Sequence, residues 1–304
     1  MLRQALLALS AGERVQRLAF SSLARGVVER HVPGDVAAVI DGLARRGLLV
    51  SAEHLGGEVT DRAQAERAVG DHLALLDLLP AGADASVSLT ALGLRLSEEL
   101  ALDNAAVVCQ AAESRGVTVT LEAAEHDAVR GLYGVHATLR KEHPDVGVVV
   151  HAHLPGAVER CERLDGARVR LSKGGHPAPG ALTAPADVDR SYARCLKTLM
   201  AGGAYPMVAT HDPRLLRIAG TLAVLHGREP SGFEYQLRHG LRTDEQERLA
   251  EQGAQVRVRV PCGPGWYVQL TRRLADRPRD LALVARALLS PGRPPVARAR
   301  LSRP

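Results

Sequence analysis

The sequence predicts a single α/β domain, a (βα)8 barrel of the TIM type with a helical arm before its first strand. Two observations predict this fold. Short apolar, β-branched segments alternate with segments of helical periodicity, which is the pattern of repeated βαβ units. Several of these apolar segments end in polar or basic residues or in glycine, as barrel strands do at the ends that carry function. A chain of 304 residues is long enough for one such barrel.

The arm covers residues 1–46. Leucines near its start recur at helical spacing, and the Pro-Gly pair at 33–34 separates them from a second short helix. The barrel is expected over residues 47–290. A tail rich in proline and arginine, residues 291–304, follows it and is expected to be disordered.

Eight expected strands alternate with eight expected helices, and this order favours parallel pairing with helices on the outside. We expect strands at 47–55, 85–92, 117–123, 146–154, 167–174, 205–211, 232–237 and 256–261. We expect helices at 61–79, 94–114, 127–142, 157–164, 186–201, 213–226, 243–252 and 266–289.

A doubly wound open sheet is the competing architecture. A dinucleotide-binding sheet of that kind carries a Gly-x-Gly-x-x-Gly turn after its first strand. Here the first strand leads instead into His54-Leu-Gly-Gly-Glu. The sequence also has no internal repeat and no interior linker, so the closed barrel is our prediction.

Composition argues against several classes of protein. Aromatic residues make up 3% of the chain, so leucine, valine and alanine must form the core. The net charge of +5 comes from arginines spread along the helices, without the clustered basic face of a nucleic-acid-binding protein. No apolar stretch is long enough to span a bilayer. We expect a cytoplasmic protein and leave open a peripheral contact with the inner face of a membrane.

Three histidines at expected strand ends, His151, His153 and His211, raise the alternative of metal-dependent hydrolysis. Arg170 and Lys173 on a neighbouring strand would make that position strongly positive, so we expect no metal. We expect no signal peptide, and we therefore expect reduced thiols. The cysteines lack the paired spacing of a metal site and stand at positions 109, 161, 195 and 262.

Lys173 is one of only three lysines, and it precedes Gly174 and Gly175 at an expected strand end. A cation beside a glycine pair suits contact with a phosphate or another cofactor group, because glycine lets a ligand approach the backbone. An ordinary solvated lysine is the alternative. Schiff-base chemistry fits the position of Lys173 but not the glycine pair, and no serine nucleophile elbow is present.

Four motifs follow one another along the second half of the chain. They are Arg170-Leu-Ser-Lys-Gly-Gly, Tyr205-Pro-Met-Val-Ala-Thr-His-Asp, Phe233-Glu-Tyr-Gln-Leu-Arg-His-Gly and Arg272-Arg-Leu-Ala-Asp-Arg-Pro. With His54-Leu-Gly and the segment that starts at Ser86, they resemble the proline dehydrogenase family over nearly the whole chain. The resemblance implies a distorted barrel with FAD across the carboxyl ends of its strands. It also implies hydride transfer from the carbon beside a secondary amine, with a quinone or another molecule as electron acceptor.

The resemblance assigns roles to particular residues. It implies that Arg170 contacts the flavin near its reactive nitrogen and acts with Glu122 in catalysis. Arg272 and Arg273 would hold the substrate carboxylate, a role that suits the forked donors of paired guanidiniums. The other implied substrate contacts are Ser88, His176, Arg259 and Gln269. The implied FAD contacts are Ala123, His151, Arg170, Lys173, Gly174, Gly175, Thr210 and His211.

The departures from the family pattern lie mostly on the substrate side, whereas the residues expected at the cofactor are largely kept. His176, Arg259 and Gln269 each stand where the family has a tyrosine. The remaining departures are Ser88 for a lysine, Glu122 for an aspartate and His151 for a glutamine. Tyrosines would close an apolar box around a small ring, so these changes predict a more polar wall.

A carboxylate at position 122 needs a partner, because an unpaired buried charge costs several kcal/mol or takes up a proton. We therefore expect Glu122 to pair with Arg259. If Arg259 stays free instead, it would receive a second anionic group of a larger substrate.

Three functions remain open on this basis. The first is a flavin-dependent dehydrogenase or oxidase that acts on a carboxylated amine more polar than proline. The second is an authentic L-proline dehydrogenase that forms 1-pyrroline-5-carboxylate. The third is a non-catalytic homologue that binds a flavin or an amino acid. The Arg272–Arg273 pair argues against the third function, and Ser88 with Arg259 argues against the second.

Overall fold

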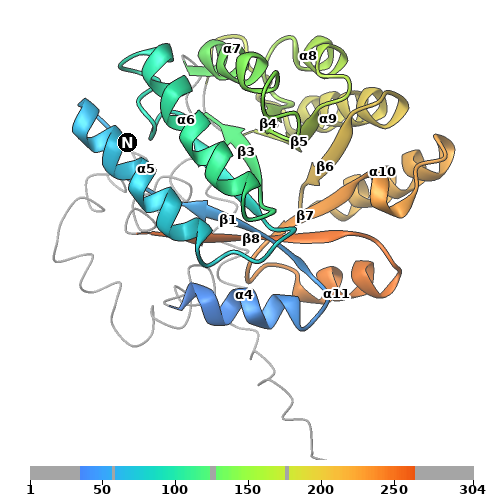
Figure 1. Ribbon diagram of the computed structural model, residues 1–304. Coiled ribbons are helices and arrows are strands. Elements are labelled where there is room, and N and C mark those ends of the chain that lie inside the picture. Colours follow the sequence, from blue (N-terminus) through green and yellow to red (C-terminus); the bar gives the residue numbers. More distant parts are fainter. Residues whose placement is uncertain (1–34, 57–58, 124–127, 175–177, 264–304) are drawn as a thin grey trace, which may run out of the picture.

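A computed structural model describes residues 35–56, 59–123, 128–174 and 178–263 of the protein. In these residues eight parallel strands pair in chain order, and the last pairs with the first to close a barrel (Figure 1). The predicted barrel is thereby confirmed, and the open sheet is not formed. The strands are β1 (Leu49–His54), β2 (Asp84–Ser88), β3 (Thr118–Glu122), β4 (Gly147–His151), β5 (Arg168–Ser172), β6 (Tyr205–Ala209), β7 (Glu234–Arg238) and β8 (Val256–Cys262).

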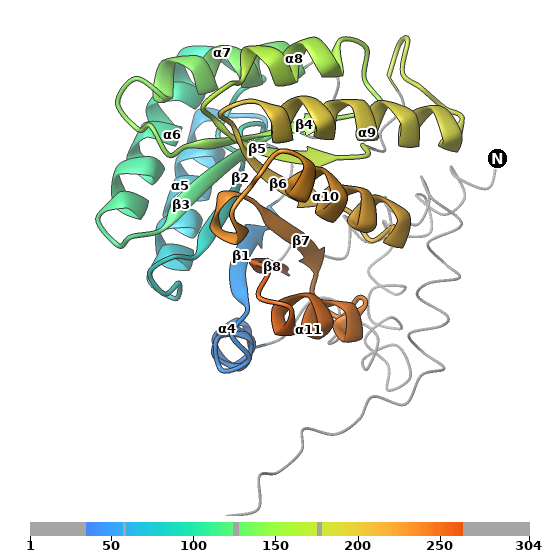
Figure 2. The same ribbon diagram turned by 90° about the vertical axis from the view of Figure 1, so that its right-hand side faces the viewer.

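Helices cover the outside of the barrel (Figure 2). They stand where the sequence predicts them, with ends that coincide or differ by a few residues. The helices are α4 (Val36–Ala44), α5 (Arg62–Leu76), α6 (Glu98–Glu113), α7 (Val129–Leu139), α8 (Ala157–Arg163), α9 (Pro185–Ala201), α10 (Pro213–Leu225) and α11 (Thr243–Glu251), with a 3-10 turn, η2, at Pro230–Gly232. Helices α4, α5, α6 and α10 begin at a side-chain cap: Asp61, for example, accepts a hydrogen bond from the amide of Gln64 at 2.8 Å.

Helix α4 lies outside the seam where β8 meets β1 and contacts both strands. Its buried residues Ile40 and Leu43 face the barrel, so this part of the predicted arm belongs to the barrel wall. The rest of the arm, residues 1–34, lies outside the described residues. So do the expected helix at 266–289 and the tail at 291–304.

The shell between strands and helices is built from leucine, valine and alanine, as predicted. Alternate residues of each strand supply it, because successive side chains point to opposite faces. On β5, Val169 and Leu171 are fully buried members of this apolar shell. Arg170 between them therefore points into the barrel.

The barrel interior is ionic, whereas aliphatic side chains fill most barrels of this type. Arg257 pairs with Glu234 at 2.8 Å near the amino-terminal ends of the strands. Arg170 pairs with Asp84 at 2.8 Å, and neither side chain is exposed. A third set of charges lies at the carboxyl ends and belongs to the candidate site described below.

Asp84 keeps its charge in spite of its burial. Burial alone would raise the pKa of Asp84. The charges of Arg170 and Arg257 and the hydrogen bonds from Ser51 and Thr120 together outweigh burial, so the pKa of Asp84 is lowered. Ser51 donates to the carboxylate at 2.6 Å, and so does Thr120. Asp84 thus joins β1, β2, β3 and β5 at one point inside the barrel.

We expect Asp84→Ala to lower the free energy of unfolding by about 3–5 kcal/mol, because it leaves the Arg170 guanidinium buried without its carboxylate. Urea denaturation at neutral pH measures this change. The control is Asp77→Ala, which removes an exposed partner of Arg115 and should cost about 1 kcal/mol or less. Equal losses in the two variants would contradict a stabilising role for the internal pair.

Candidate functional site

The carboxyl ends of the strands bring several predicted site residues together at one mouth of the barrel. Ser88 and Glu122 end β2 and β3 and lie side by side in the strand register. His151 ends β4, Lys173 directly follows β5, and Thr210 and His211 directly follow β6. The order of these ends around the closed barrel gives a continuous polar rim.

The expected pair of Glu122 and Arg259 is present, with 3.5 Å between Oε2 and Nη2. The same Nη2 is nearer to another carboxylate, that of Glu53 on β1, at 2.9 Å. Arg238 at the end of β7 also approaches Glu53, at 3.6 Å. Arg259 is therefore held by two carboxylates, and the alternative of a free Arg259 is wrong.

Sequence reasoning missed Glu53. It belongs to β1 and alternates in phase with Ser51, whose hydroxyl bonds to Arg170 inside the barrel at 3.1 Å. A carboxylate two residues beyond an inward-facing serine must also point inward. That spacing was a usable signal, because a charged residue inside a buried strand requires an opposite charge.

Glu122 holds its proton more tightly than an ordinary glutamate. Burial raises its pKa, and the charge of Glu53 raises it further, while Arg259, Arg170 and Arg238 act in the opposite direction. The Glu122 side chain is 22% exposed, so it is reachable from the mouth.

Arg170 forms the floor beneath this cluster and is fully buried. Its Nε donates to Gln236 at 2.7 Å, and its terminal nitrogens donate to Ser86, Ser51 and Asp84. One of these nitrogens also lies 3.9 Å from Glu122. The expected contact of Arg170 with a flavin stays a prediction. Because the guanidinium N–H groups already donate to protein side chains, a flavin contact would have to share one of these donors.

Lys173 is fixed by two carboxylates that were not predicted. Its Nζ lies 2.6 Å from Asp189 on α9 and 2.9 Å from Asp212, the residue that caps α10. Arg214 bridges the same two aspartates at 2.7 Å each. The hydrogen bond from Arg214 lowers the pKa of Asp212; burial opposes this effect, and Lys173 adds to it.

Gly174 is required by its surroundings, and the reason differs from the one inferred from sequence. Its φ of +87° is in the left-handed region, and an added Cβ would lie 1.8 Å from Nδ1 of His153. The place of a side chain is thus taken by the His153 ring. The sequence analysis instead expects this glycine to let a ligand approach the backbone.

The two residues after β6 are held by nearby backbone. The hydroxyl of Thr210 accepts from the amide of Asp212 at 3.1 Å. Nε2 of His211 accepts from the amide of Arg238 at 3.0 Å, so its ring proton resides on Nδ1. Ala123, directly after β3, is buried, and the rings of His151 and His153 meet edge to face at 6.0 Å.

Part of the predicted site lies outside the described residues: Gly175, His176, Gln269, Arg272 and Arg273. Within the described ranges, there is no group of three or more histidine, cysteine, aspartate or glutamate side chains that could hold a metal ion. Among the same residues no helix is both long and apolar enough to cross a membrane.

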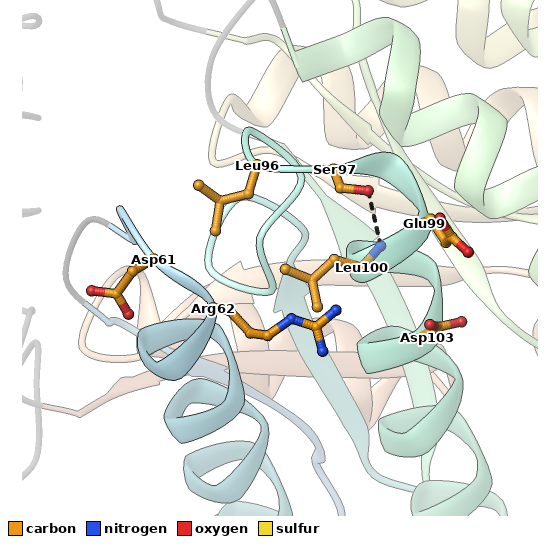
Figure 3. Close-up of a pocket in the computed structure, with 7 residues that line it drawn as sticks. All are labelled: Asp61, Arg62, Leu96, Ser97, Glu99, Leu100 and Asp103. Carbon is orange, nitrogen blue, oxygen red and sulfur yellow. Dashed lines mark hydrogen bonds between the residues drawn. The ribbon is translucent and has the colours of Figure 1, made fainter.

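A separate groove lies between the amino-terminal ends of α5 and α6 (Figure 3). Asp61, Glu99 and Asp103 outnumber Arg62 along it, so its lining is acidic. None of the rim residues described above lines this groove, and it is distinct from the candidate site.

The chain is similar to known proteins over most of its length. A sequence model described as proline dehydrogenase matches residues 168–275. Proline dehydrogenase 1 of Bacillus subtilis subsp. natto is 28% identical over 300 residues, which cover 95% of this chain and 99% of that protein. Proline dehydrogenase of Deinococcus radiodurans is 29% identical over 303 residues, which cover 94% of this chain and 97% of that protein.

Solved structures share the fold. Proline utilization A of Bdellovibrio bacteriovorus, inactivated by N-propargylglycine, matches 90% of this chain with a TM-score of 0.78 and 18% identity. Proline utilization A of Corynebacterium freiburgense matches 95% with a TM-score of 0.74 and 15% identity. This chain spans only 36% and 34% of those two proteins, which are much longer.

We expect Gly174→Ala to destabilise the protein more than Gly227→Ala. Both glycines have a positive φ, but nothing lies within 4 Å of a Cβ at Gly227. The control therefore loses about 1–2 kcal/mol from backbone strain alone. Gly174→Ala should lose about 1–3 kcal/mol more, because the His153 ring must move.

Thermal and urea unfolding measure both losses. Adding His153→Ala to each glycine variant should recover the excess at position 174 only. Equal losses in the two glycine variants would show that the His153 contact carries no weight.

Proposed function

We infer from these similarities that the chain belongs to the proline dehydrogenase family, and we propose that it is a flavin-dependent dehydrogenase or oxidase of a proline-like, carboxylated amine. The observation that carries this proposal is the combination of family similarity over nearly the full chain with a partly exposed carboxyl group of raised pKa, Glu122, at the barrel mouth. Function in such barrels resides at this end of the strands.

The residues of the rim fit FAD as the cofactor. Lys173 is 29% exposed, and an ammonium that binds two carboxylates still has a third N–H donor for a phosphate. The Thr210 hydroxyl and the neutral His211 ring stand beside it at the neighbouring strand end. We therefore assign Lys173, Gly174, Thr210 and His211 to the cofactor, together with His151, Ala123 and Gly175.

FAD, once bound at this rim, would supply the acceptor for a hydride from the carbon beside the amine nitrogen, so that the substrate leaves with a C=N bond. The protein must place the amine and hold the proton that it releases. Glu122 suits this role, because its raised pKa brings its proton affinity nearer to neutral pH. Arg170 supports Glu122 from below at 3.9 Å. Arg272 and Arg273 hold the substrate carboxylate in this proposal.

The described wall of the mouth favours a polar substrate without a second negative charge. Ser88 and Thr90 place two hydroxyls 2.9 Å apart at the end of β2. Arg259 already pairs with Glu53 at 2.9 Å, so it offers little attraction to another anion. An uncharged polar substituent on a proline-like molecule fits this wall, with His176 and Gln269 as further proposed contacts.

L-Proline itself is the alternative substrate, supported by the names of the full-length relatives. In either case the electrons pass on to a quinone or another acceptor, and we propose a cytoplasmic enzyme that meets such an acceptor at the membrane face. A non-catalytic, flavin-binding homologue is the third alternative, and the experiment below separates it from both enzymes.

We expect the purified protein to be yellow with bound FAD, and its flavin to be bleached under anaerobic conditions by hydroxylated or N-substituted relatives of proline in preference to L-proline. Preferred bleaching by L-proline selects the alternative substrate. A protein that takes up no added FAD contradicts both enzymes. A loaded flavin that no cyclic or N-substituted amino acid reduces selects the non-catalytic homologue.

The same assay tests the carboxylate contact. Arg272→Ala with Arg273→Ala should raise the substrate concentration needed for half-maximal bleaching about a hundredfold or more, because charge-assisted bidentate hydrogen bonds are lost. Arg277→Ala on the same segment is the matched control. Unchanged bleaching in the double variant would show that the substrate carboxylate is held elsewhere.

A further inference from the structure

The charges at the barrel mouth form one cluster that spans five strands. Glu53 comes from β1, Glu122 from β3, Arg170 from β5, Arg238 from β7 and Arg259 from β8. Of the two carboxylates that Arg259 holds, Glu53 is the nearer to Nη2, at 2.9 Å against 3.5 Å for Glu122. Glu53 is also buried, with 7% of its surface exposed.

We propose that Glu53 is a positioning residue, which draws Arg259 away from Glu122 and so leaves Glu122 able to take up and release a proton at the barrel mouth. The proposal rests on the proposed function only in naming Glu122 as the proton acceptor. The contacts that support it belong to the protein alone.

Three arginines surround Glu122. Arg170 lies 3.9 Å from it and Arg259 lies 3.5 Å from it, and Arg238 adds a further positive charge. By themselves these guanidiniums would keep Glu122 ionised, since an opposite charge at 4–6 Å lowers a carboxyl pKa by about 1–3 units. A permanently ionised, arginine-bound carboxylate is a poor base.

Burial of Glu122 opposes this effect of the arginines most strongly, and Glu53 opposes it next, in two ways. It binds the guanidinium of Arg259 at the shorter distance and also approaches Arg238 at 3.6 Å, so both arginines are partly neutralised. Its own negative charge then repels a charge on Glu122, and this effect is second only to burial in raising the pKa of Glu122. A single side chain on β1 thereby tunes a group on β3.

The other neighbours of Glu122 do not offer this control. Ser88 is its partner in register on β2 and carries no charge. On the other side β4 ends in His151, a second ionisable side chain on the rim. The carboxylate of Asp84, deeper in the barrel, already accepts hydrogen bonds from Arg170, Ser51 and Thr120.

The test is the titration of Glu122 in the full-length holoprotein without substrate, followed by 13C NMR after labelling of the glutamate carboxyl carbons. Glu122→Gln identifies the signal, and His151→Gln shows whether the neighbouring histidine contributes to the curve. We expect Glu53→Gln to lower the pH of half-protonation of Glu122 by about 1–2 units, because one repelling charge is lost and Arg259 turns fully to Glu122. We expect Arg259→Gln to raise it.

Glu234→Gln is the matched control. It also removes one buried carboxylate from an arginine pair inside the barrel, but at the amino-terminal ends of the strands, so the Glu122 titration should not move. Glu53→Asp keeps the negative charge and replaces Glu53→Gln as the test variant if Glu53→Gln does not fold. It should lower the pH of half-protonation of Glu122 by a smaller amount than Glu53→Gln.

An unchanged Glu122 titration in Glu53→Gln, or an equal shift in Glu234→Gln, would overturn the proposal. Because the titration needs no turnover, its result is independent of the proposed function. If no substrate reduces the flavin while the titration shifts as expected, only the proposed function fails.

Discussion

Charge pairing inside the barrel is the constraint on which the rest of this structure depends. Each guanidinium that points inward must meet a carboxylate, because an unpaired buried charge costs several kcal/mol. The Arg170–Asp84 pair joins β5 to β2 across the barrel, and Arg257–Glu234 joins β8 to β7. A slip of one residue in any of these strands would turn its charged side chains toward the apolar shell. The ionic interior therefore fixes strand register as well as closing the barrel.

The same arrangement connects the interior to the site. Arg170 contacts Asp84 below and lies near Glu122 above, so the mouth rests on a floor that is already ordered by hydrogen bonds. Lys173 is likewise fixed before any ligand arrives, by aspartates from α9 and from the cap of α10. Both groups are held in place by other protein groups, as a preorganised site requires.

The strands, the helices and the polar strand ends could be predicted because they depend on local pattern. Boundaries were less certain: the expected strand at 85–92 ends at Ser88, since Leu89 and Leu92 bury their side chains in the turn that follows. The pairing of Glu122 with Arg259 was predictable from the need to compensate a charge. Glu53 was not found, because its spacing from Ser51 becomes informative only once Ser51 is known to face Arg170 inside the barrel. Asp189 was missed for a similar reason, since it lies on a helix and reaches a strand end only after packing.

The seam between β1 and β8 has a consequence for synthesis. β1 is made early, but the strand that covers its free edge and neutralises Glu53 is the last of the barrel to leave the ribosome. Until then the nascent chain exposes an unpaired strand edge and cannot bury that carboxylate without loss. Helix α4, which is made just before β1, can shield one face of the waiting strand. Final closure must therefore come after translation of nearly the whole barrel.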